Sequence, residues 1–389
     1  MKYKQNIILL CGIIFLQGFV FYGPIATLYR ENRGITLFDI FLIESISWLV
    51  MILLEIPFGY FADRYGYKKT LLLSNGVYFV SKIVFFGAHN FNGFLLERLL
   101  LSVSLAGLSG CDVSMLHGSS LEGHRDRIYS LYSVSATAGF FLASVMTTWL
   151  IRSPLSGMDV DRVGFLTIFP YGLAFLLTAF LKELPVSHET RPKLRNSVRS
   201  ALSNPALVAL VASVALSREV FQVVTVFLNQ SIYLRSGIDV RWFGLLIVVI
   251  QGMCLLSLKT HLLQRWFGHR KALLGLFTVG PVACVMLYFL RSPVLCVLGV
   301  MMIALAMAFI EPLSMGLKNK LLRDIDRATV LSVYAMGAEI IAVVVNPVIG
   351  KAAEISLGAA LLSCVGLGII SVVLYLIWGA DHKSNSAVS

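Results

Sequence analysis

Five carboxylates, those of Glu44, Asp112, Glu219, Glu311 and Glu339, lie inside long apolar stretches of this sequence, where charged side chains are rare. A carboxylate at the centre of a bilayer costs about 3 kcal/mol or more, so each one is a functional candidate. A carboxyl group that is removed from water can take up and release a proton near neutral pH. A fixed ion pair between two helices is the alternative for each. In order of preference, the candidates for proton coupling are Glu44, Glu339, Asp112 and Glu311.

The composition indicates that these residues belong to a membrane protein with many spans. Of 389 residues, 57% are hydrophobic and 14% are charged, and the mean hydropathy is +0.81, whereas about 25% of a soluble protein is charged. The net charge of +11 comes from cations in short gaps between apolar stretches, which argues against nucleic-acid binding. The six cysteines fall within apolar stretches without a Cys-x-x-Cys pair, so we expect neither disulfides nor a metal site.

A helix needs about 20 apolar residues to cross a bilayer, and the sequence predicts twelve such spans. We expect the first to be retained as a span and not cleaved as a signal peptide. The predicted organisation is a bundle over 1–182, a cytoplasmic linker over 183–204, a bundle over 205–380 and a disordered tail over 381–389. The spans are predicted near residues 5–29, 36–61, 70–88, 93–119, 129–151, 163–182, 205–233, 241–262, 271–290, 294–317, 329–350 and 356–378.

The distribution of Lys and Arg predicts how the chain is oriented in the membrane. With the N-terminus inside, 21 of the 32 Lys and Arg lie on the inner side and nine on the outer side. The remaining two, Lys82 and Arg218, lie within spans. We therefore expect a multi-pass protein of the cell membrane, a bacterial inner membrane, with both termini cytoplasmic.

The two halves of the chain repeat each other at a spacing of about 200 residues. The segment GYFADRYGYKK aligns with HLLQRWFGHRK when Gly66 is placed on Gly268, 202 positions later. The segment DRIYSLYS from Asp126 similarly matches DRATVLSVY from Asp326, 200 positions later. Two nearly equal spacings around a basic linker predict a duplication of six spans, which is an architecture found in transporters.

The chain resembles the major facilitator superfamily, and the segment that begins at Gly59 carries the resemblance. This segment is similar to the superfamily's loop signature, G-x-x-x-D-R-x-G-[RK]-[RK], with Tyr67 as one extra residue. In the second-half copy, Arg265 stands where the carboxylate would be. The resemblance implies an all-α membrane protein with twelve transmembrane helices in two pseudo-symmetric six-helix bundles, similar to drug/proton antiporters. The matching residues are Gly59, Asp63, Arg64, Gly66, Lys68 and Lys69.

The same segment suits a gate at the inner end of the bundles. A glycine on the helix lets another helix approach closely, and a glycine in the loop permits a turn with positive φ. Asp63 lies near the C-terminal end of a helix, opposes the helix dipole and therefore needs a partner. A basic loop that only sets the orientation is the alternative. The gating candidates are Gly59, Asp63, Arg64, Gly66, Lys68, Lys69 and, from the helix before the loop, Glu55.

The resemblance implies that spans 1, 4, 7 and 10 line a central substrate cavity. Met and aromatic residues at helical spacing suit a hydrophobic ligand, with ordinary packing as the alternative. Gly139, Ala143 and Ser144 allow close helix packing in the fifth span, which lacks the Gly-Pro pattern of many drug–proton antiporters. The cavity candidates are Gln17, Tyr22, Met115, Arg218, Glu219, Gln222, Thr225 and Asn229.

Together these features predict a monomeric secondary transporter that works by alternating access, with a small-molecule substrate, protons and the lipid bilayer as its partners. Proton-coupled efflux of hydrophobic or amphipathic compounds is the preferred function. Proton-coupled uptake of a small nutrient or metabolite is the alternative, and a non-transporting receptor on the same fold is a third hypothesis. The sequence contains neither a phosphate-binding loop for ATP nor a nucleophile–base pair, so we expect no enzyme activity, no catalytic residue and no cofactor.

Overall fold

In the computed structural model, all regular secondary structure is helical within the residues that it describes, which are 3–152, 155–184, 205–321 and 327–386. Within them, eleven helical stretches are long and apolar enough to cross a membrane, and α1 (Lys4–Gln17) is a shorter apolar helix. The predicted all-helical membrane fold is confirmed. The predicted linker lies outside the described residues from position 185 onwards.

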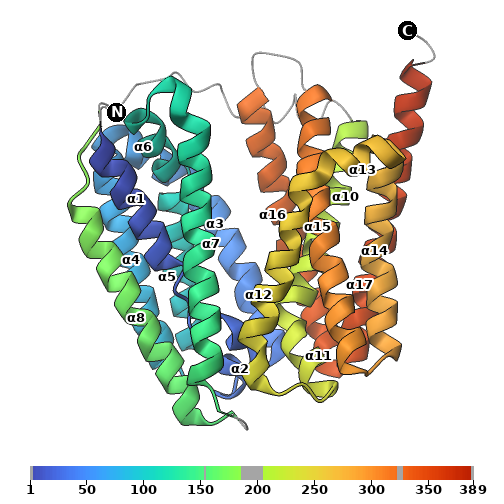
Figure 1. The fold of residues 1–389 in the computed structure, drawn as a ribbon, viewed down its shortest axis with the longest axis horizontal. Coiled ribbons are helices and arrows are strands. Elements are labelled where there is room, and N and C mark those ends of the chain that lie inside the picture. The colour runs from blue at the N-terminus through green and yellow to red at the C-terminus, as the bar shows by residue number, and fades with distance from the viewer. Residues whose placement is uncertain (1–2, 153–154, 185–204, 322–326, 387–389) are drawn as a thin grey trace. The chain divides into compact units, whose positions relative to one another are not determined.

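The chain folds as two compact units, each of which is a bundle of helices (Figure 1). Unit 1 comprises Met1–Glu189 together with Asp239–Val248, and unit 2 comprises Thr190–Ile238 and Val249–Ser389. The helices that follow α1 up to residue 179 are η1 (Gly23–Ile25), α2 (Ala26–Glu31), α3 (Leu37–Tyr65), α4 (Tyr67–Gly87), α5 (Phe91–Leu108), α6 (Cys111–Ser119), η2 (Glu122–His124), α7 (Arg125–Leu150) and α8 (Gly157–Ala179).

The later part of the chain contains two interruptions of regular α-helix. One is η3 (Val223–Leu228), a π-helical segment between α10 (Pro205–Gln222) and α11 (Asn229–Arg235). The other is η5 (Leu255–Lys259), a 3-10 segment. The remaining helices are η4 (Val240–Trp242), α12 (Phe243–Cys254), α13 (Thr260–Phe267), α14 (His269–Phe289), α15 (Pro293–Leu321), α16 (Arg327–Ile355) and α17 (Leu357–Ser386).

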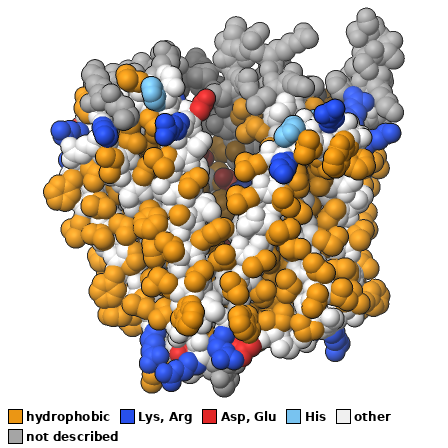
Figure 2. Space-filling view, in the orientation of Figure 1, with side chains coloured by type: hydrophobic (Ala, Val, Ile, Leu, Met, Phe, Trp, Pro, Cys, Tyr) orange, Lys and Arg blue, Asp and Glu red, His pale blue; other side chains and the backbone are white. Residues whose placement is uncertain are grey.

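On the face shown in Figure 2, apolar side chains cover the middle of the described residues, whereas Lys and Arg gather towards the two ends, as expected for helices surrounded by lipid. The last helix, α17, runs to Ser386 and thus extends into residues 381–389, for which the sequence predicts a disordered tail. No proline occurs between Trp378 and Ser386, so the stretch contains no strong helix breaker.

The predicted first span, 5–29, is not one continuous helix. The α1 helix ends at Gln17, and a short irregular segment leads through η1 into α2. Gly18, Gly23 and Pro24 lie in this segment, and glycine and proline are the residues least suited to a helix interior. A reading of apolar content alone misses the break because every residue from Gly18 to Ile25 is apolar or small.

The duplication predicted from the sequence is visible in two pairs of turns that contain glycines with positive φ. Gly34 and Gly237 both have φ of 82°, and Gly66 and Gly268 have φ of 96° and 73°. The members of these pairs are 203 and 202 positions apart. Positive φ is unfavourable for any residue with a Cβ atom, so both halves turn the chain in the same way at equivalent places.

An arginine closes the C-terminal end of a helix in each half, again at a spacing of 202 positions. The Arg33 guanidinium donates to the carbonyl oxygens of Phe86 at 2.6 Å and Ala88 at 3.0 Å, at the end of α4. Arg235 donates to the carbonyl oxygens of Leu287 and Leu290, at the end of α14. The last carbonyl groups of a helix have no partner within the helix, and they attract cations. The two arginines therefore cap equivalent helices in the two halves.

We expect Arg33→Gln and Arg235→Gln each to lower the free energy of unfolding by about 2 kcal/mol, since each removes charged hydrogen bonds to part-buried carbonyl groups. Arg33→Gln should cost more because Arg33 also pairs with Asp161 at 2.7 Å. Unfolding of the purified protein in detergent measures the effect. Arg241→Gln is the control, because the exposed Arg241 pairs locally with Asp239. Equal stability of all three variants would contradict the prediction.

Candidate functional site

Side chains from two other helices satisfy the backbone where the first crossing breaks. The Tyr171 hydroxyl donates to the carbonyl oxygen of Gln17 at 2.6 Å, and the Thr147 hydroxyl donates to that of Phe21 at 2.7 Å. The amide of Phe21 donates to Thr167 Oγ1 at 3.2 Å. Backbone groups that lack a partner are expensive inside a membrane. The α7 and α8 helices therefore make the break possible.

Two ion pairs lie in the interior of unit 1, and together they form what we call the charge cluster: Glu44, Lys82, Glu97 and Arg98. The Arg98 guanidinium contacts the Glu44 carboxylate on α3, and Lys82 Nζ on α4 lies 3.5 Å from Glu97 Oε1. The side chains of Glu44, Lys82 and Glu97 are buried, with 5%, 2% and 1% of each residue exposed. Glu97 and Arg98 are consecutive on α5, so a single turn of this helix provides one member of each ion pair.

The charge cluster is connected to the break in the first crossing. Lys82 Nζ donates to the Tyr22 hydroxyl at 2.9 Å, and Tyr22 is the residue directly before η1. The same ammonium group lies 5.2 Å from the ring centroid of Tyr78 and 5.3 Å from that of Tyr171. Aromatic faces attract cations at such distances. Lys82 is therefore held by a carboxylate, a hydroxyl and aromatic rings.

A chain of amide and hydroxyl groups adjoins the break from the other side. Gln17 Nε2 donates to Asn75 Oδ1 at 2.7 Å, and Asn75 Nδ2 donates to Thr178 Oγ1 at 2.8 Å. Gln17 is the last residue of α1, Asn75 lies on α4 and Thr178 lies on α8. This chain of hydrogen bonds joins the three helices through groups that are buried and satisfied.

The charge cluster lies well inside the membrane-spanning part of unit 1. Glu44 and Arg98 are each seven residues from the first residue of their helices, Leu37 and Phe91. At 1.5 Å per residue this places them about 10 Å along each helix. Ionised groups at such a depth are costly unless they are paired and hydrogen-bonded, and in proteins they mark sites of transport or proton transfer.

The second half of the chain has no copy of this cluster. The positions 202 residues after the four charged residues hold Leu246, Cys284, Gly299 and Val300. The arginine caps and the glycine turns are duplicated, whereas the buried charges are not. The charge cluster is therefore not needed to build such a bundle, which favours a functional role for it.

The structure places the four predicted proton-coupling residues in four different surroundings. Glu44 belongs to the charge cluster. Asp112 accepts hydrogen bonds from the Tyr132 hydroxyl at 2.6 Å and from the amide of Val113 at 2.7 Å. It lies 14 residues beyond Arg98 along α5 and α6, or about 20 Å at helical rise. Glu339 is half-buried on α16, and Glu311 is exposed on α15.

The predicted gating segment forms the end of α3, a turn at Gly66 and the start of α4. Asp63 is half-buried in the last turns of α3, and Glu55 is half-buried two residues before Pro57. The amide of Lys68 donates to Glu183 Oε1 at 3.1 Å. This turn needs a glycine for its φ of 96°, and a Cβ atom on Gly66 would lie 2.7 Å from the Glu183 carboxyl carbon, so that flexible side chain would have to move. The remaining gating candidates, Gly59, Arg64, Lys68 and Lys69, lie on the helices at either side of this turn.

The predicted cavity residues divide between the two units. Gln17 and Tyr22 lie at the break, next to the charge cluster. Met115 is fully buried in an apolar core cluster of α1, α6 and their neighbours. The other five follow one another along α10, η3 and α11, where Thr225 lies in the π-helical segment: Arg218, Glu219, Gln222, Thr225 and Asn229. A π-helical segment within an α-helix is frequent at functional sites.

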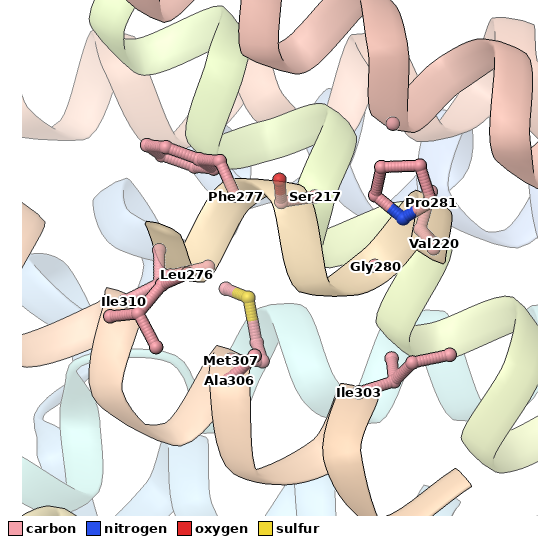
Figure 3. A pocket seen from close by; sticks show the side chains of 11 residues that line it. Ser217, Val220, Leu276, Phe277, Gly280, Pro281, Ile303, Ala306, Met307 and Ile310 are labelled. Carbon is pink, nitrogen blue, oxygen red and sulfur yellow. The ribbon is translucent and has the colours of Figure 1, made fainter. Parts of the chain in front are cut away.

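A small cavity lies inside unit 2, between α10, α14, α15 and α17 (Figure 3). Its volume is about 20 Å³, enough for one water molecule. Pro281 and Gly368 meet at its edge, where a Cβ atom on Gly368 would lie 2.7 Å from Pro281 Cδ. Drug-sized ligands occupy about 300–1,000 Å³, so this cavity is too small to be a substrate site.

Sequence reasoning missed three polar residues that the structure brings to these sites. Glu97 and Arg98 lie within the predicted fourth span, 93–119, but Arg98 was assigned to the outer surface because it is close to the start of the span. Their position inside a predicted span could have identified them as candidates for buried charges. Glu183 was assigned to the linker, and nothing in its surroundings in the sequence indicates a contact with the turn at Gly66.

Comparison with known proteins supports the assignment of the fold. The family model described as Major Facilitator Superfamily matches residues 8–266, about two thirds of the chain. A curated relative from Buchnera aphidicola subsp. Schizaphis graminum, named "Uncharacterized transporter", is 23% identical over 189 residues. That match covers 46% of this chain and 46% of the relative, so the chain spans about half the length of the curated relative in this alignment.

Solved structures match over nearly the whole chain. The nucleoside transporter NupG is 15% identical, with a TM-score of 0.79 over 97% of this chain and 99% of that one. A D-xylose-proton symporter is 12% identical, with a TM-score of 0.73 over 95% and 96% of the two chains. At these identities the likeness shows the fold alone, and it agrees with the predicted all-helical membrane fold. On the evidence of the family model, the chain belongs to the major facilitator superfamily of membrane transporters.

Proposed function

We propose that this transporter is proton-coupled and that the charge cluster of unit 1 is its coupling site. The observation that supports this proposal is the pairing of Glu44 with Arg98 next to Lys82 and Glu97, deep inside the membrane-spanning part. The four ionised groups sum to zero charge. A proton on Glu44 would leave one positive charge uncompensated where water is scarce, and that cost changes the relative stability of two conformations.

The arrangement also suggests which group compensates the charge of Arg98 when Glu44 is protonated. Glu97 precedes Arg98 on the same helix and is held by Lys82. An anionic or strongly polar substrate group near the cluster would compensate Arg98 in place of Glu44. Such a substrate would bind together with the proton, which is the linkage that uptake requires. For exchange, a cationic amphipathic substrate and the proton would compete for the Glu44 carboxylate.

Export of hydrophobic or amphipathic compounds in exchange for protons is the first candidate for the direction and the substrate. Its support is the apolar and aromatic character of the helices around the charge cluster, together with the resemblance of the Gly59 segment to drug/proton antiporters. In this proposal Asp63, Glu55 and the turn at Gly66 act as a gate between two six-helix halves, 1–182 and 205–380. Both termini would face the cytoplasm of a cell whose membrane holds the protein as a monomer.

Proton-coupled uptake of a small polar nutrient or metabolite is the second candidate. The charge cluster favours it, since an anionic or strongly polar substrate group would compensate Arg98 while Glu44 is protonated. The solved structures named as a nucleoside transporter and a D-xylose-proton symporter share the fold and make uptake as plausible as efflux.

The sign of the proton movement separates the two candidates. Purified protein is reconstituted into liposomes with a pH-sensitive dye inside, and dyes, drugs and polar metabolites are added outside in turn. For an antiporter, entry of a hydrophobic compound should make the interior more alkaline, and a protonophore should abolish the signal. Acidification on entry of a polar metabolite would support uptake instead. Substrate movement without any pH change would contradict proton coupling, and absence of movement for the whole panel would favour the receptor hypothesis.

A further inference from the structure

The connection between α12 and α14 in unit 2 is cationic and lacks a local counter-charge. No Asp or Glu occurs between Asp239 and Glu311. The cations of η5, α13 and the start of α14 are Lys259, Arg265, Arg270 and Lys271. The equivalent connection in unit 1 carries Asp63 and is contacted by Glu183. The two copies of the loop have therefore diverged in charge, and the second one attracts anions.

The same connection exposes large apolar side chains beside its cations. Leu263 packs against the core cluster of unit 2, which anchors α13 to the bundle. Trp266 and Phe267, on the same short helix, are 72% and 58% exposed, and Leu258 in the preceding η5 is 80% exposed. Tryptophan and phenylalanine next to Lys and Arg are typical of helices that lie in the interface between lipid acyl chains and headgroups.

A groove next to this connection combines the same two kinds of group. Its volume is about 370 Å³, and it is lined by the first residues of α14 and by α17. The Arg270 guanidinium carbon lies 5.6 Å from the centroid of the Trp378 ring, and the Tyr375 hydroxyl donates to the carbonyl oxygen of Arg270 at 3.1 Å. Leu274 and Leu376 continue the groove as an apolar wall. Basic pockets between membrane helices bind anionic lipid headgroups.

We propose that this surface of unit 2 binds an anionic phospholipid from the membrane leaflet that it meets. Arg270 and Lys271 contact the phosphate, one acyl chain lies along Leu274 and Leu376, and Trp266 lies at the level of the headgroups. A zwitterionic lipid offers the same acyl chains and a phosphate, but its own ammonium group competes with the arginine and lysine. The cations therefore select the headgroup, whereas the apolar side chains contribute equally to both lipids.

Quenching of Trp266 fluorescence by brominated lipids tests the proposal. The protein is reconstituted into phosphatidylcholine liposomes that contain either brominated phosphatidylglycerol or brominated phosphatidylcholine at equal mole fraction. The chain has five tryptophans, so the Trp266 contribution is obtained as the difference between the wild type and Trp266→Phe. We expect brominated phosphatidylglycerol to be enriched near Trp266 about fivefold for each cation that reaches the headgroup.

Removal of two cations should abolish this selectivity. In Arg270→Gln/Lys271→Gln, quenching by the two lipids should become equal, whereas Arg241→Gln/Arg291→Gln, which removes two cations from the same acid-free part of the sequence, should retain the preference. If the first double variant does not fold, Lys271→Gln alone, at an exposed position, should reduce the preference severalfold. Equal quenching of the wild type by both lipids, or an unchanged preference in the Arg270 and Lys271 variants, would overturn the proposal.

Discussion

Glu44→Gln is expected to destabilise the protein by about 3–5 kcal/mol and to abolish proton-coupled transport. The variant leaves the Arg98 guanidinium, whose side chain is 22% exposed, in the membrane-spanning part of unit 1 without the carboxylate that it contacts. Removal of one partner of a buried ion pair is costly because the remaining charge stays uncompensated. Unfolding of the purified protein in detergent and the dye assay in liposomes measure the two effects.

Glu44→Gln/Arg98→Gln separates stability from coupling. Replacement of both partners of a buried pair by neutral groups is often close to neutral for stability, so the double variant should recover most of the stability. Its downhill exchange of substrate should persist, but the accompanying pH change should be absent. Proton movement that survives in a folded double variant would show that Glu44 is not the coupling residue, and would direct attention to Glu339, Asp112 or Glu311.

Gly139→Ala is expected to lower the free energy of unfolding by about 3 kcal/mol, at the upper end of the usual cost of overpacking. A Cβ atom on Gly139 of α7 would lie 2.0 Å from the carbonyl oxygen of Phe15 and 3.2 Å from Gly18 Cα. The contact is between backbone atoms, so no side-chain rotation can relieve it, and α1 and α7 would have to separate. Close backbone contacts at small residues are a main source of helix association in membranes.

Gly275→Ala on α14 is the matched control for this prediction. It makes the same substitution inside a membrane-spanning helix, but a Cβ atom there meets nothing within 4 Å. Because alanine is the better helix former, by about 1 kcal/mol, Gly275→Ala should leave the stability equal or slightly higher. Thermal unfolding in one detergent compares the variants. Equal stability of Gly139→Ala and Gly275→Ala would mean that the α1–α7 crossing is looser than the structure indicates.

Apolar content was sufficient to predict a helical membrane protein with many spans. Glycine spacing also predicted the tight turn at Gly66 and its copy at Gly268, because positive φ restricts the choice of residue so strongly. The break between α1 and α2 was not predictable in this way. It depends on Tyr171, Thr147 and Thr167, which follow it by more than a hundred positions in the sequence.

The candidate site was predictable only in part, for a related reason. Glu44 could be singled out because a lone carboxylate in an apolar stretch is conspicuous. The pairing of Arg98 with Glu44 could not be predicted, because Arg98 lies near the end of a predicted span, where a cation usually faces water. Pairing between α3 and α5 depends on how the helices pack, and one sequence contains no direct record of that packing.

The hydroxyl groups that close the break in the first crossing make that break a stiff element. Any flexing between Gln17 and Phe21 would rupture bonds to Tyr171, Thr147 and Thr167 together, inside a medium that offers no substitute partners. A break in a transporter helix is often interpreted as a hinge. Here we expect the break to move with α7 and α8 as one rigid body, so the hinges of any transport cycle lie in other segments.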